Sequence, residues 1–405
     1  MKLLKVADRS LAALVGVIIG AVLVLSVDAF TRQPETESPR VSTERVPSPS
    51  IDPTPVDLPK PPSRTAVLAW SPGGLPAGAE SAVERARSVV AATTVVGGQD
   101  WIVETRSSDG SVVDRPGDGY RIPVDVAAVE PRRYARFVPA GDRDLIHALG
   151  PGRVLLARTA AELREAEPGM AITLSDRTVR VAGVVSDVAA NGYEILMAKP
   201  APSSWNAKYR FLLAEVKGRR YAAVEERLAP LLEPGRRLRV RSGRETPFLR
   251  YGDAVLPMMA LKKTFGEFAA RPRADGGIDV DPSWVRHNIE RASVPILGSV
   301  ICHRVIVPQL RAALREVEER GLGFTIDPAD YGGCYSPRFI NADPQARLSH
   351  HAWGIAVDIN VSENAFGTRP DIDPRLVDAL TEWGFTWGGG WLLPDGMHFE
   401  WVAFP

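Results

Sequence analysis

The sequence lacks net charge, and a large part of it lacks motifs that carry chemistry. Its 49 basic and 49 acidic residues cancel, so no global field favours nucleic acid or an acidic substrate. Residues 65–245 contain no cluster of metal ligands, no Gly-rich phosphate loop and no paired acids, and we interpret the lone His147 there as structural. A chain of 405 residues that is 45% hydrophobic and 24% charged is typical of a globular protein with two or three domains.

The N-terminus carries a long apolar run. Basic residues precede a small or apolar segment from Leu11 to Val27, which as a helix would span roughly 25 Å. Because positive charge in front of such a helix stays inside, we expect the N-terminus in the cytoplasm and the rest of the chain outside. Residues 1–30 are therefore predicted to be a single-pass anchor in the cell membrane. A signal peptide cleaved near Ala29 is the alternative, and it also exports the body.

Residues 31–64 are rich in proline, serine and threonine and offer almost nothing to bury. This composition predicts an extended spacer between the membrane and the folded body. Cysteine is scarce, because only Cys302 and Cys334 are present. In an exported chain this even count favours a disulfide, and two buried thiols are the alternative.

Strand-like and helix-like segments alternate in residues 65–245, which predicts an α+β middle domain. β-branched residues and turn signals mark strands over 92–104, 120–129, 153–159, 178–188, 193–199 and 236–242. Helical periodicity marks residues 80–90, 160–167 and 221–232. The last strand and the residues just after it carry Arg236, Arg237, Arg239, Arg241 and Arg244. These arginines indicate that one face of the strand is exposed to solvent, and contact with anionic wall polymer is the alternative.

Some middle segments, SPGGLPAGAESAVERA and VRVAGVVSDV among them, loosely resemble the extracytoplasmic domains of certain ABC-transporter permeases. These permeases are of the lipoprotein-release and macrolide-export type. The resemblance implies a binding or scaffolding role, which includes docking to a membrane-protein partner.

Residues 246–405 differ in sequence pattern from the middle domain, and we predict that they form an α+β domain with a small antiparallel sheet. An amphipathic helix is expected over 305–320, ended by Gly321, and a second helix over 375–384. The last part of this region, from His350 onward, holds three of the six histidines of the chain.

The segment LSHHAWGIAVDIN, residues 348–360, places one acid inside an apolar run. A buried acid costs stability unless something compensates it. Alternation along 354–360 puts Asp358 on a small, polar face, opposite a core face of three aliphatic side chains. His351 lies seven residues earlier, so the chain must turn near Gly354 if both side chains are to meet one ion.

The segment PDGMHFEWV supplies the other candidates. Alternation puts His398 on the same face as Glu400, and a Pro-Asp-Gly turn can fold the Asp395 carboxylate back beside the imidazole. Two imidazoles and one carboxylate make a three-ligand zinc site with a position left for water. A second carboxylate is then needed to take the proton of that water. Spacing alone leaves open which of the two adjacent histidines is a ligand, and whether an arginine compensates Asp358 instead.

These segments resemble the double motif of the D-alanyl-D-alanine metallopeptidases. These are zinc peptidases of the clan that includes lysostaphin-type enzymes and the hedgehog signalling domain. The resemblance covers roughly residues 290–405, and its motifs read Ser349-x-His351-x-x-Gly354-x-Ala356-x-Asp358 and Asp395-x-x-His398. It implies that the zinc ligands are His351, Asp358 and His398, and that Asp395 is the general base.

The resemblance also implies an arginine ahead of the first motif, which meets the substrate carboxylate or the developing oxyanion. We prefer Arg338, because a planar guanidinium suits a carboxylate, and Arg304 and Arg347 are alternatives. Many carboxypeptidases of the group carry Glu where this chain has Asp395. The Asp form is frequent among relatives that cut between L-Ala and D-Glu.

Together these expectations describe a membrane-anchored, extracytoplasmic zinc peptidase that cleaves peptidoglycan stem peptides. We expect a D-Ala-D-Ala carboxypeptidase, and an L-Ala-D-Glu endopeptidase is the alternative. A non-catalytic protein that binds the cell wall or a partner with the same fold is the alternative of a different class.

Overall fold

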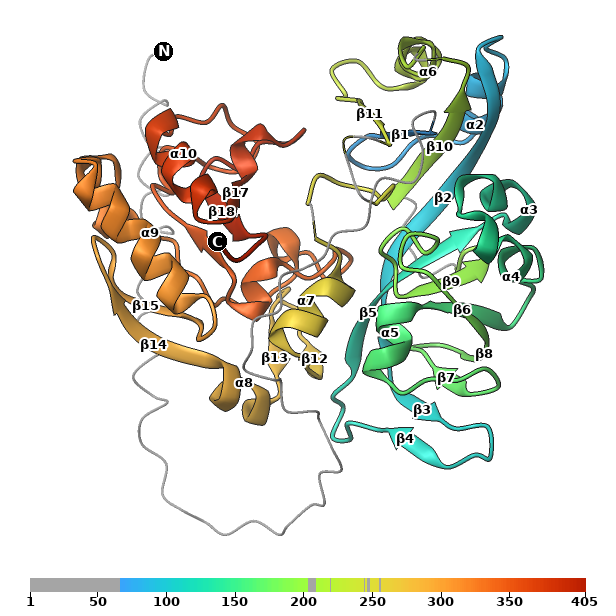
Figure 1. Cartoon of the computed structure of the whole chain (residues 1–405), viewed down its shortest axis with the longest axis horizontal. Coiled ribbons are helices and arrows are strands. Elements are labelled where there is room, and N and C mark those ends of the chain that lie inside the picture. The colour runs from blue at the N-terminus through green and yellow to red at the C-terminus, as the bar shows by residue number, and fades with distance from the viewer. Residues whose placement is uncertain (1–65, 203–208, 219, 244, 246–247, 255) are drawn as a thin grey trace, which may run out of the picture. The chain divides into compact units, whose positions relative to one another are not determined.

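The computed structural model describes residues 66–405, apart from 203–208, 219, 244, 246–247 and 255 (Figure 1). The predicted anchor in residues 1–30 and the spacer in residues 31–64 lie outside the described residues. Among the described helices, none has the length and apolar character needed to span a bilayer. The described chain is mixed α+β, as predicted.

Residues 66–242, called the sheet region below, form one eleven-stranded sheet. The strands pair in the order β11-β1-β10-β2-β5-β9-β6-β8-β7-β3-β4, antiparallel except for the pairs β5–β9 and β6–β8. In chain order they are β1 (Ala66–Trp70), β2 (Val89–Ile102), β3 (Glu104–Arg106), β4 (Val112–Asp114), β5 (Ile122–Val129), β6 (Arg153–Ala157), β7 (Ala171–Thr173), β8 (Thr178–Val185), β9 (Ile195–Ala198), β10 (Arg210–Val216) and β11 (Arg239–Ser242).

Short helices accompany the sheet. They are α2 (Ala79–Glu84), α3 (Pro131–Tyr134), α4 (Arg143–His147), α5 (Arg158–Leu163) and α6 (Ala222–Leu228). The helix predicted over 80–90 ends at Glu84, because Val89 pairs with Val216 and opens β2. Each predicted strand of this region is present; the short strands β3, β4 and β7 are additional, and so are β1 and β10. Nearly every side chain of these two strands is buried, so they lack the alternation that marks a half-buried strand.

Residues 256–405, called the C-terminal region below, surround a separate core. The strands form two hairpins and one three-stranded antiparallel sheet of order β16-β18-β17: β12 (Ala270–Pro272), β13 (Ile278–Val280), β14 (Ile289–Val294), β15 (Gly298–His303), β16 (Ala356–Asp358), β17 (Phe385–Trp387) and β18 (His398–Trp401). The helices are α7 (Met258–Phe265), α8 (Pro282–Asn288), α9 (Val307–Glu319) and α10 (Pro374–Glu382).

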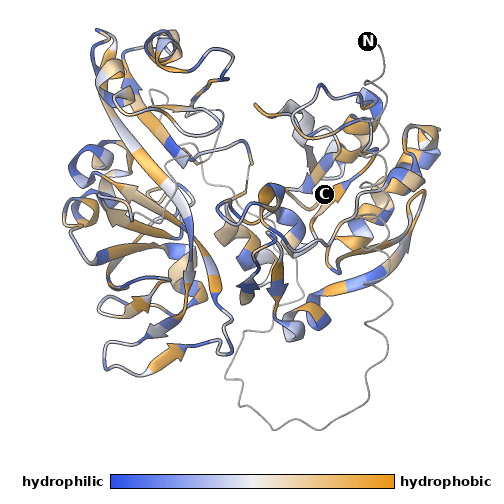
Figure 2. Ribbon diagram, turned by 180° about the vertical axis from the view of Figure 1, so that it is seen from behind, coloured by the Kyte–Doolittle hydropathy of each residue, from blue (hydrophilic) through white to orange (hydrophobic). Residues whose placement is uncertain are grey.

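The two longest helices follow the sequence closely. Helix α9 buries one apolar stripe, and Figure 2 shows apolar and polar residues alternating along it. It ends before Gly321, which has the left-handed φ of 69° that favours glycine. Helix α10 begins after Asp373, whose carboxylate accepts a hydrogen bond from the Arg375 amide, with Pro374 in the first turn. Both helices contribute to the core of the C-terminal region; α10 packs against β17 and α9, and α9 also packs against β14.

Buried polar contacts join the two regions. Lys262 of α7 is fully buried, and its Nζ lies 2.7 Å from Glu194 Oε1 and 2.8 Å from Glu267 Oε1. The Leu348 amide donates to Gln99 Oε1 at 2.7 Å. Because a buried charge is tolerated only when it is paired, these contacts fix the C-terminal region against the sheet.

Candidate metal centre

The three side chains predicted as metal ligands converge on one point. His351 lies in the 3-10 helix η9 (His350–Trp353), Asp358 ends β16, and His398 begins β18 directly opposite Asp358. His351 Nε2 is 3.1 Å from Asp358 Oδ2 and 3.2 Å from His398 Nδ1, which is 3.0 Å from Asp358 Oδ1. All three residues are buried, and their ligand atoms lie within 4.8 Å of one another.

A turn at Gly354 brings His351 onto the same side as Asp358. The Ser349 hydroxyl accepts a hydrogen bond from the His351 amide and starts η9. Gly354 ends it with φ 68°, and a Cβ there would lie 2.8 Å from the His303 amide nitrogen. Glycine is therefore required twice over, by the left-handed backbone and by the close approach of β15.

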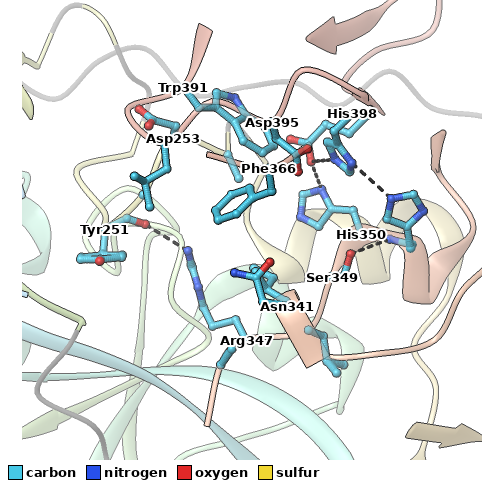
Figure 3. A pocket seen from close by; sticks show the side chains of 18 of the residues that line it. Tyr251, Asp253, Asn341, Arg347, Ser349, His350, Phe366, Trp391, Asp395 and His398 are labelled. Carbon is cyan, nitrogen blue, oxygen red and sulfur yellow. Dashed lines mark hydrogen bonds and ion pairs between the residues drawn. The ribbon is translucent and has the colours of Figure 1, made fainter. Parts of the chain in front are cut away.

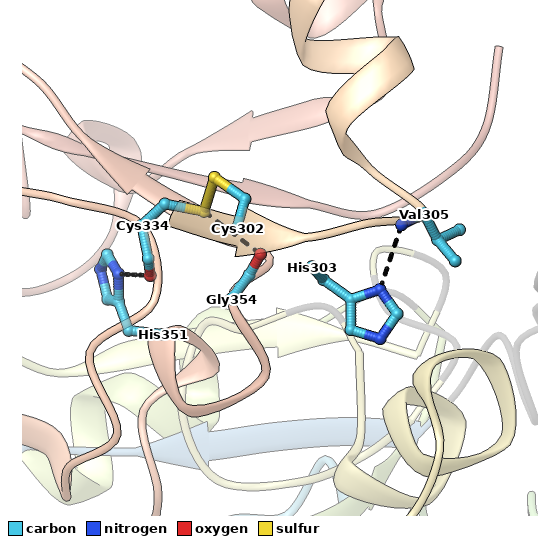
Figure 4. Close-up of a disulfide and its surroundings, with 6 residues drawn as sticks. All are labelled: Cys302, His303, Val305, Cys334, His351 and Gly354. Atoms are coloured by element: carbon cyan, nitrogen blue, oxygen red, sulfur yellow. Dashed lines mark hydrogen bonds between the residues drawn. A yellow bond between two sulfur atoms is a disulfide. The ribbon is translucent and has the colours of Figure 1, made fainter. Parts of the chain in front are cut away.

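Hydrogen bonds to the outer ring nitrogens fix the tautomers of both histidines. His351 Nδ1 lies 2.8 Å from the Cys334 carbonyl, and that cysteine is bonded to Cys302 (Figure 4). His398 Nε2 lies 3.3 Å from Glu400 Oε2. Because each outer nitrogen donates a proton, the neutral form of each imidazole presents its lone pair on the other nitrogen, and His351 Nε2 and His398 Nδ1 face the same point.

The electrostatics of the cluster follow from its burial and its charges. Burial opposes the charged form of Asp358, but the adjacent His351 and His398 hold the pKa of this carboxyl below its usual range. Burial lowers the pKa of His351, which keeps this imidazole neutral. Burial also opposes protonation of His398, yet Asp358 and Glu400 raise its pKa to about 10. A cation at this point would therefore displace a proton from His398 on binding.

The donor set fits zinc. Two imidazole nitrogens and one carboxylate leave a fourth position open, as in catalytic zinc sites. Ligand atoms of a tetrahedral site with bonds of about 2.0–2.1 Å lie about 3.3 Å apart, close to the separations of 3.0 to 3.2 Å here. An arginine also contributes to the compensation of Asp358, because Arg338 Nη2 forms an ion pair with Asp358 Oδ2 at 3.8 Å, although this distance is too long for a hydrogen bond.

Asp395 lies beside the cluster at one end of a cavity of about 580 Å³ (Figure 3). Its amide donates to the Gly388 carbonyl at 3.0 Å, and its carbonyl accepts from the His398 amide at 3.2 Å. Burial raises the pKa of Asp395 to about 6, and its Oδ1 has no hydrogen-bond partner among the described residues. A buried carboxylate with a raised pKa and a free oxygen is suited to general acid–base work.

The three candidate arginines lie at different places in the C-terminal region. Arg338 and Arg347 both line the cavity, whereas Arg304 donates to the Arg286 carbonyl at 3.3 Å on the exposed side of the C-terminal region. Arg338 is the one beside the cluster, and Arg347 donates to the Tyr251 carbonyl at 3.3 Å toward the other end. Of the three candidates, Arg338 is therefore the one in contact with a predicted ligand.

His350 and Glu400, near the cluster, make contacts that were not predicted from the sequence. Glu400 is buried and faces His398, and His350 Nδ1 lies 2.7 Å from Glu400 Oε2. His398 and Glu400 were expected on one face, which the structure confirms, but no role followed from that expectation. The signal available was the charge itself, because a carboxylate in an apolar strand needs a partner.

Comparisons with known proteins agree in part with this geometry. Residues 342–401 match the family model described as D-alanyl-D-alanine carboxypeptidase, which supports a peptidase-family domain in the C-terminal region. No curated protein matches the chain.

Solved structures match about half of the chain. The periplasmic region of MacB from Actinobacillus actinomycetemcomitans is 12% identical, with 45% of this chain and 90% of that chain covered and a TM-score of 0.30. A permease domain from Porphyromonas gingivalis is 15% identical, with 50% and 97% covered and a TM-score of 0.30. The extracellular domain of the ABC-type transporter YknZ from Gram-positive bacteria is 11% identical, with 44% and 100% covered and a TM-score of 0.29.

Proposed function

We propose that the C-terminal region is a zinc peptidase that cleaves peptidoglycan stem peptides, with D-Ala-D-Ala carboxypeptidase activity. One observation carries the proposal: the three ligand atoms and the Asp395 carboxylate meet at the end of one cavity. The family match over residues 342–401 supports the same chemistry. The lone pairs of His351 and His398 and the charge of Asp358 would hold the zinc.

Zinc in such a site acts as a Lewis acid and lowers the pKa of water. The protein's own contribution is proton transfer and orientation. The free Oδ1 of Asp395 accepts the proton of the attacking water and returns it to the leaving amine as the peptide bond breaks. Arg338 forms an ion pair with Asp358 at 3.8 Å but no hydrogen bond to it, so its guanidinium can turn to the substrate carboxylate or the developing oxyanion.

We further propose that the protein acts outside the cytoplasm, tethered by the apolar segment in residues 1–30. The Cys302–Cys334 disulfide supports this location, because such bonds persist in oxidising compartments. The substrate would then be peptidoglycan at the membrane surface, and the sheet region would be the part available to a membrane-protein partner.

The test compares wild-type protein with Asp395→Asn, which keeps the shape of the side chain. We expect about one zinc in each form by elemental analysis. Incubation with a pentapeptide stem, followed by mass spectrometry, should show loss of the terminal D-Ala, slowed about 10²–10⁴-fold in the variant. Cleavage between L-Ala and D-Glu would keep the mechanism and change the bond that is cut. Zinc without any cleavage would favour the non-catalytic binding protein, and absence of zinc would refute the metal site.

A further inference from the structure

The loop of residues 388–395 carries two groups of the candidate site, Trp391 and Asp395. Its inner end is closed by its own backbone, since the amides of both residues donate to the Gly388 carbonyl at 3.0 Å. A Cβ at Gly388 would lie 2.8 Å from the Asp395 carbonyl, so this closure is tight. The outer end of the loop, residues 390–393, is held from elsewhere.

The outer end is held by residues that lie before the C-terminal region. The Leu392 amide donates to Asp253 Oδ2 at 2.6 Å, and its carbonyl accepts from Arg237 Nη1 at 2.7 Å. The Gly390 carbonyl accepts from Arg239 Nη2 at 3.3 Å. Figure 3 shows Asp253 beside Trp391 at the edge of the cavity. The amide and the carbonyl of Leu392 are therefore both hydrogen-bonded to side chains of residues that precede the C-terminal region.

Asp253 is the centre of this contact. It is buried, with 8% of its surface exposed, and its Oδ1 accepts a hydrogen bond from Arg241 of β11. Arg239 Nε lies 3.8 Å from the same oxygen. Two guanidinium groups thus hold one carboxylate oxygen while the other accepts from Leu392, and hydrogen bonds to a carboxylate are stronger than those between neutral groups. The arginine strand was expected from sequence to be a solvated face, and Arg237, Arg239 and Arg241 do keep part of their surface exposed, but they also make these contacts to Asp253 and the loop. Arg244 lies outside the described residues.

The backbone conformation of this loop matters to the site, because it sets the directions of the Trp391 and Asp395 side chains. The Trp391 ring packs against the His398 ring at 5.4 Å. Asp395 Oδ1 has no hydrogen-bond partner among the described residues, so the direction of its carboxylate is set by the backbone of the loop. A loop released at Leu392 would leave that carboxylate free to turn away from the cluster.

We propose that Asp253 is a positioning residue that, with Arg237, Arg239 and Arg241, clamps the loop of residues 388–395 in the conformation needed for hydrolysis. The sheet region is thereby part of the catalytic apparatus, and any displacement of β11 would slow the reaction. The kinetic part of this inference rests on the proposed function, whereas the structural part does not.

The experiment uses the full-length protein and the variant Asp253→Ala. Hydrogen exchange, read on peptides that cover residues 388–396, reports directly on the Leu392 amide. We expect exchange there to rise about 10- to 100-fold, because a hydrogen bond to a buried charge is lost. We expect kcat on a pentapeptide stem to fall by a similar factor, roughly 10- to 100-fold, with little change in KM or in zinc content.

Asp187→Asn is the matched control. This acid also accepts from a backbone amide and a side chain, Thr159 N at 2.9 Å and Thr159 Oγ1 at 2.7 Å, but within the sheet region alone. It should leave both loop exchange and kcat unchanged. Should Asp253→Ala fail to fold, Arg237→Gln removes only the contact to the Leu392 carbonyl and should give the same two changes with smaller size.

The outcomes separate the two proposals. Faster exchange of the loop with lower kcat and full zinc content supports the clamp. Unchanged exchange overturns it, as does faster exchange with unchanged kcat, and loss of zinc in Asp253→Ala would place the effect at the metal site instead. If wild-type protein cleaves no stem peptide, the proposed function fails, and loop exchange alone still decides whether Asp253 holds the loop.

Discussion

Substitution of Glu400 tests whether this carboxylate orients His398 for the proposed metal site. Its Oε2 lies 3.3 Å from His398 Nε2 and 2.7 Å from His350 Nδ1, and the side chain is buried. Burial opposes ionisation, but the adjacent histidines hold the pKa of Glu400 below its usual range, so it is an anion at neutral pH. It therefore fixes the proton of His398 on Nε2 and makes Nδ1 the better ligand.

The substitution Glu400→Gln keeps the volume and one acceptor oxygen but removes the charge. A hydrogen bond to a charged group contributes about 1.5–3 kcal/mol and one between neutral groups about 0.5–1.5 kcal/mol, so the loss is about 1–1.5 kcal/mol. That loss corresponds to a roughly tenfold weaker zinc affinity. It agrees with the about 10–100-fold effect of removing such outer partners in other metal sites.

The assay is competition for zinc between the protein and a chelating dye at pH 7. Glu382→Gln is the control, because Glu382 is an exposed acid on α10 paired with Arg320, and it should bind zinc like wild type. A zinc affinity of Glu400→Gln equal to that of wild type would refute the argument, since the His398 tautomer would then not depend on this carboxylate.

The remaining predictions concern the disulfide, a buried histidine and the steering arginine. Replacing Cys302 and Cys334 by Ala should lower the free energy of unfolding by about 2–4 kcal/mol in denaturant titrations. It should also weaken zinc binding, because the Cys334 carbonyl orients His351; unchanged zinc affinity would contradict that role. Burial lowers the pKa of His303 to about 4, so the unfolded state binds more protons between pH 4 and 6.5. The free energy of unfolding should therefore fall as the pH drops through this window, by up to about 3 kcal/mol. If wild type and His303→Gln give identical profiles of unfolding free energy against pH, His303 does not cause this loss. Arg338→Lys should raise KM for a pentapeptide stem about tenfold at unchanged zinc content, because the bidentate fork is lost; an unchanged KM would exclude Arg338 from substrate binding.

Local sequence features were sufficient for the elements whose side chains report their own environment. The amphipathic stripe predicted α9, and Gly321 predicted where that helix ends. The spacing of His351, Gly354 and Asp358 required a turn at the glycine, and the structure has it. In contrast, β1 and β10 could not be recognised by alternation, because strands buried on both faces show none.

The sequence by itself determined which residue types are available to hold a metal, in what order, and that a glycine must lie between two of them. Only the tertiary structure decided which nitrogen of each imidazole faces the point where the three side chains converge, because the Cys334 carbonyl and Glu400 bond to the other nitrogen across the fold. It also decided that Asp253 reaches the loop of Asp395, a contact over 139 positions in the chain. Periodicity describes which way a side chain points from its own element, whereas the partner it meets depends on how distant elements pack.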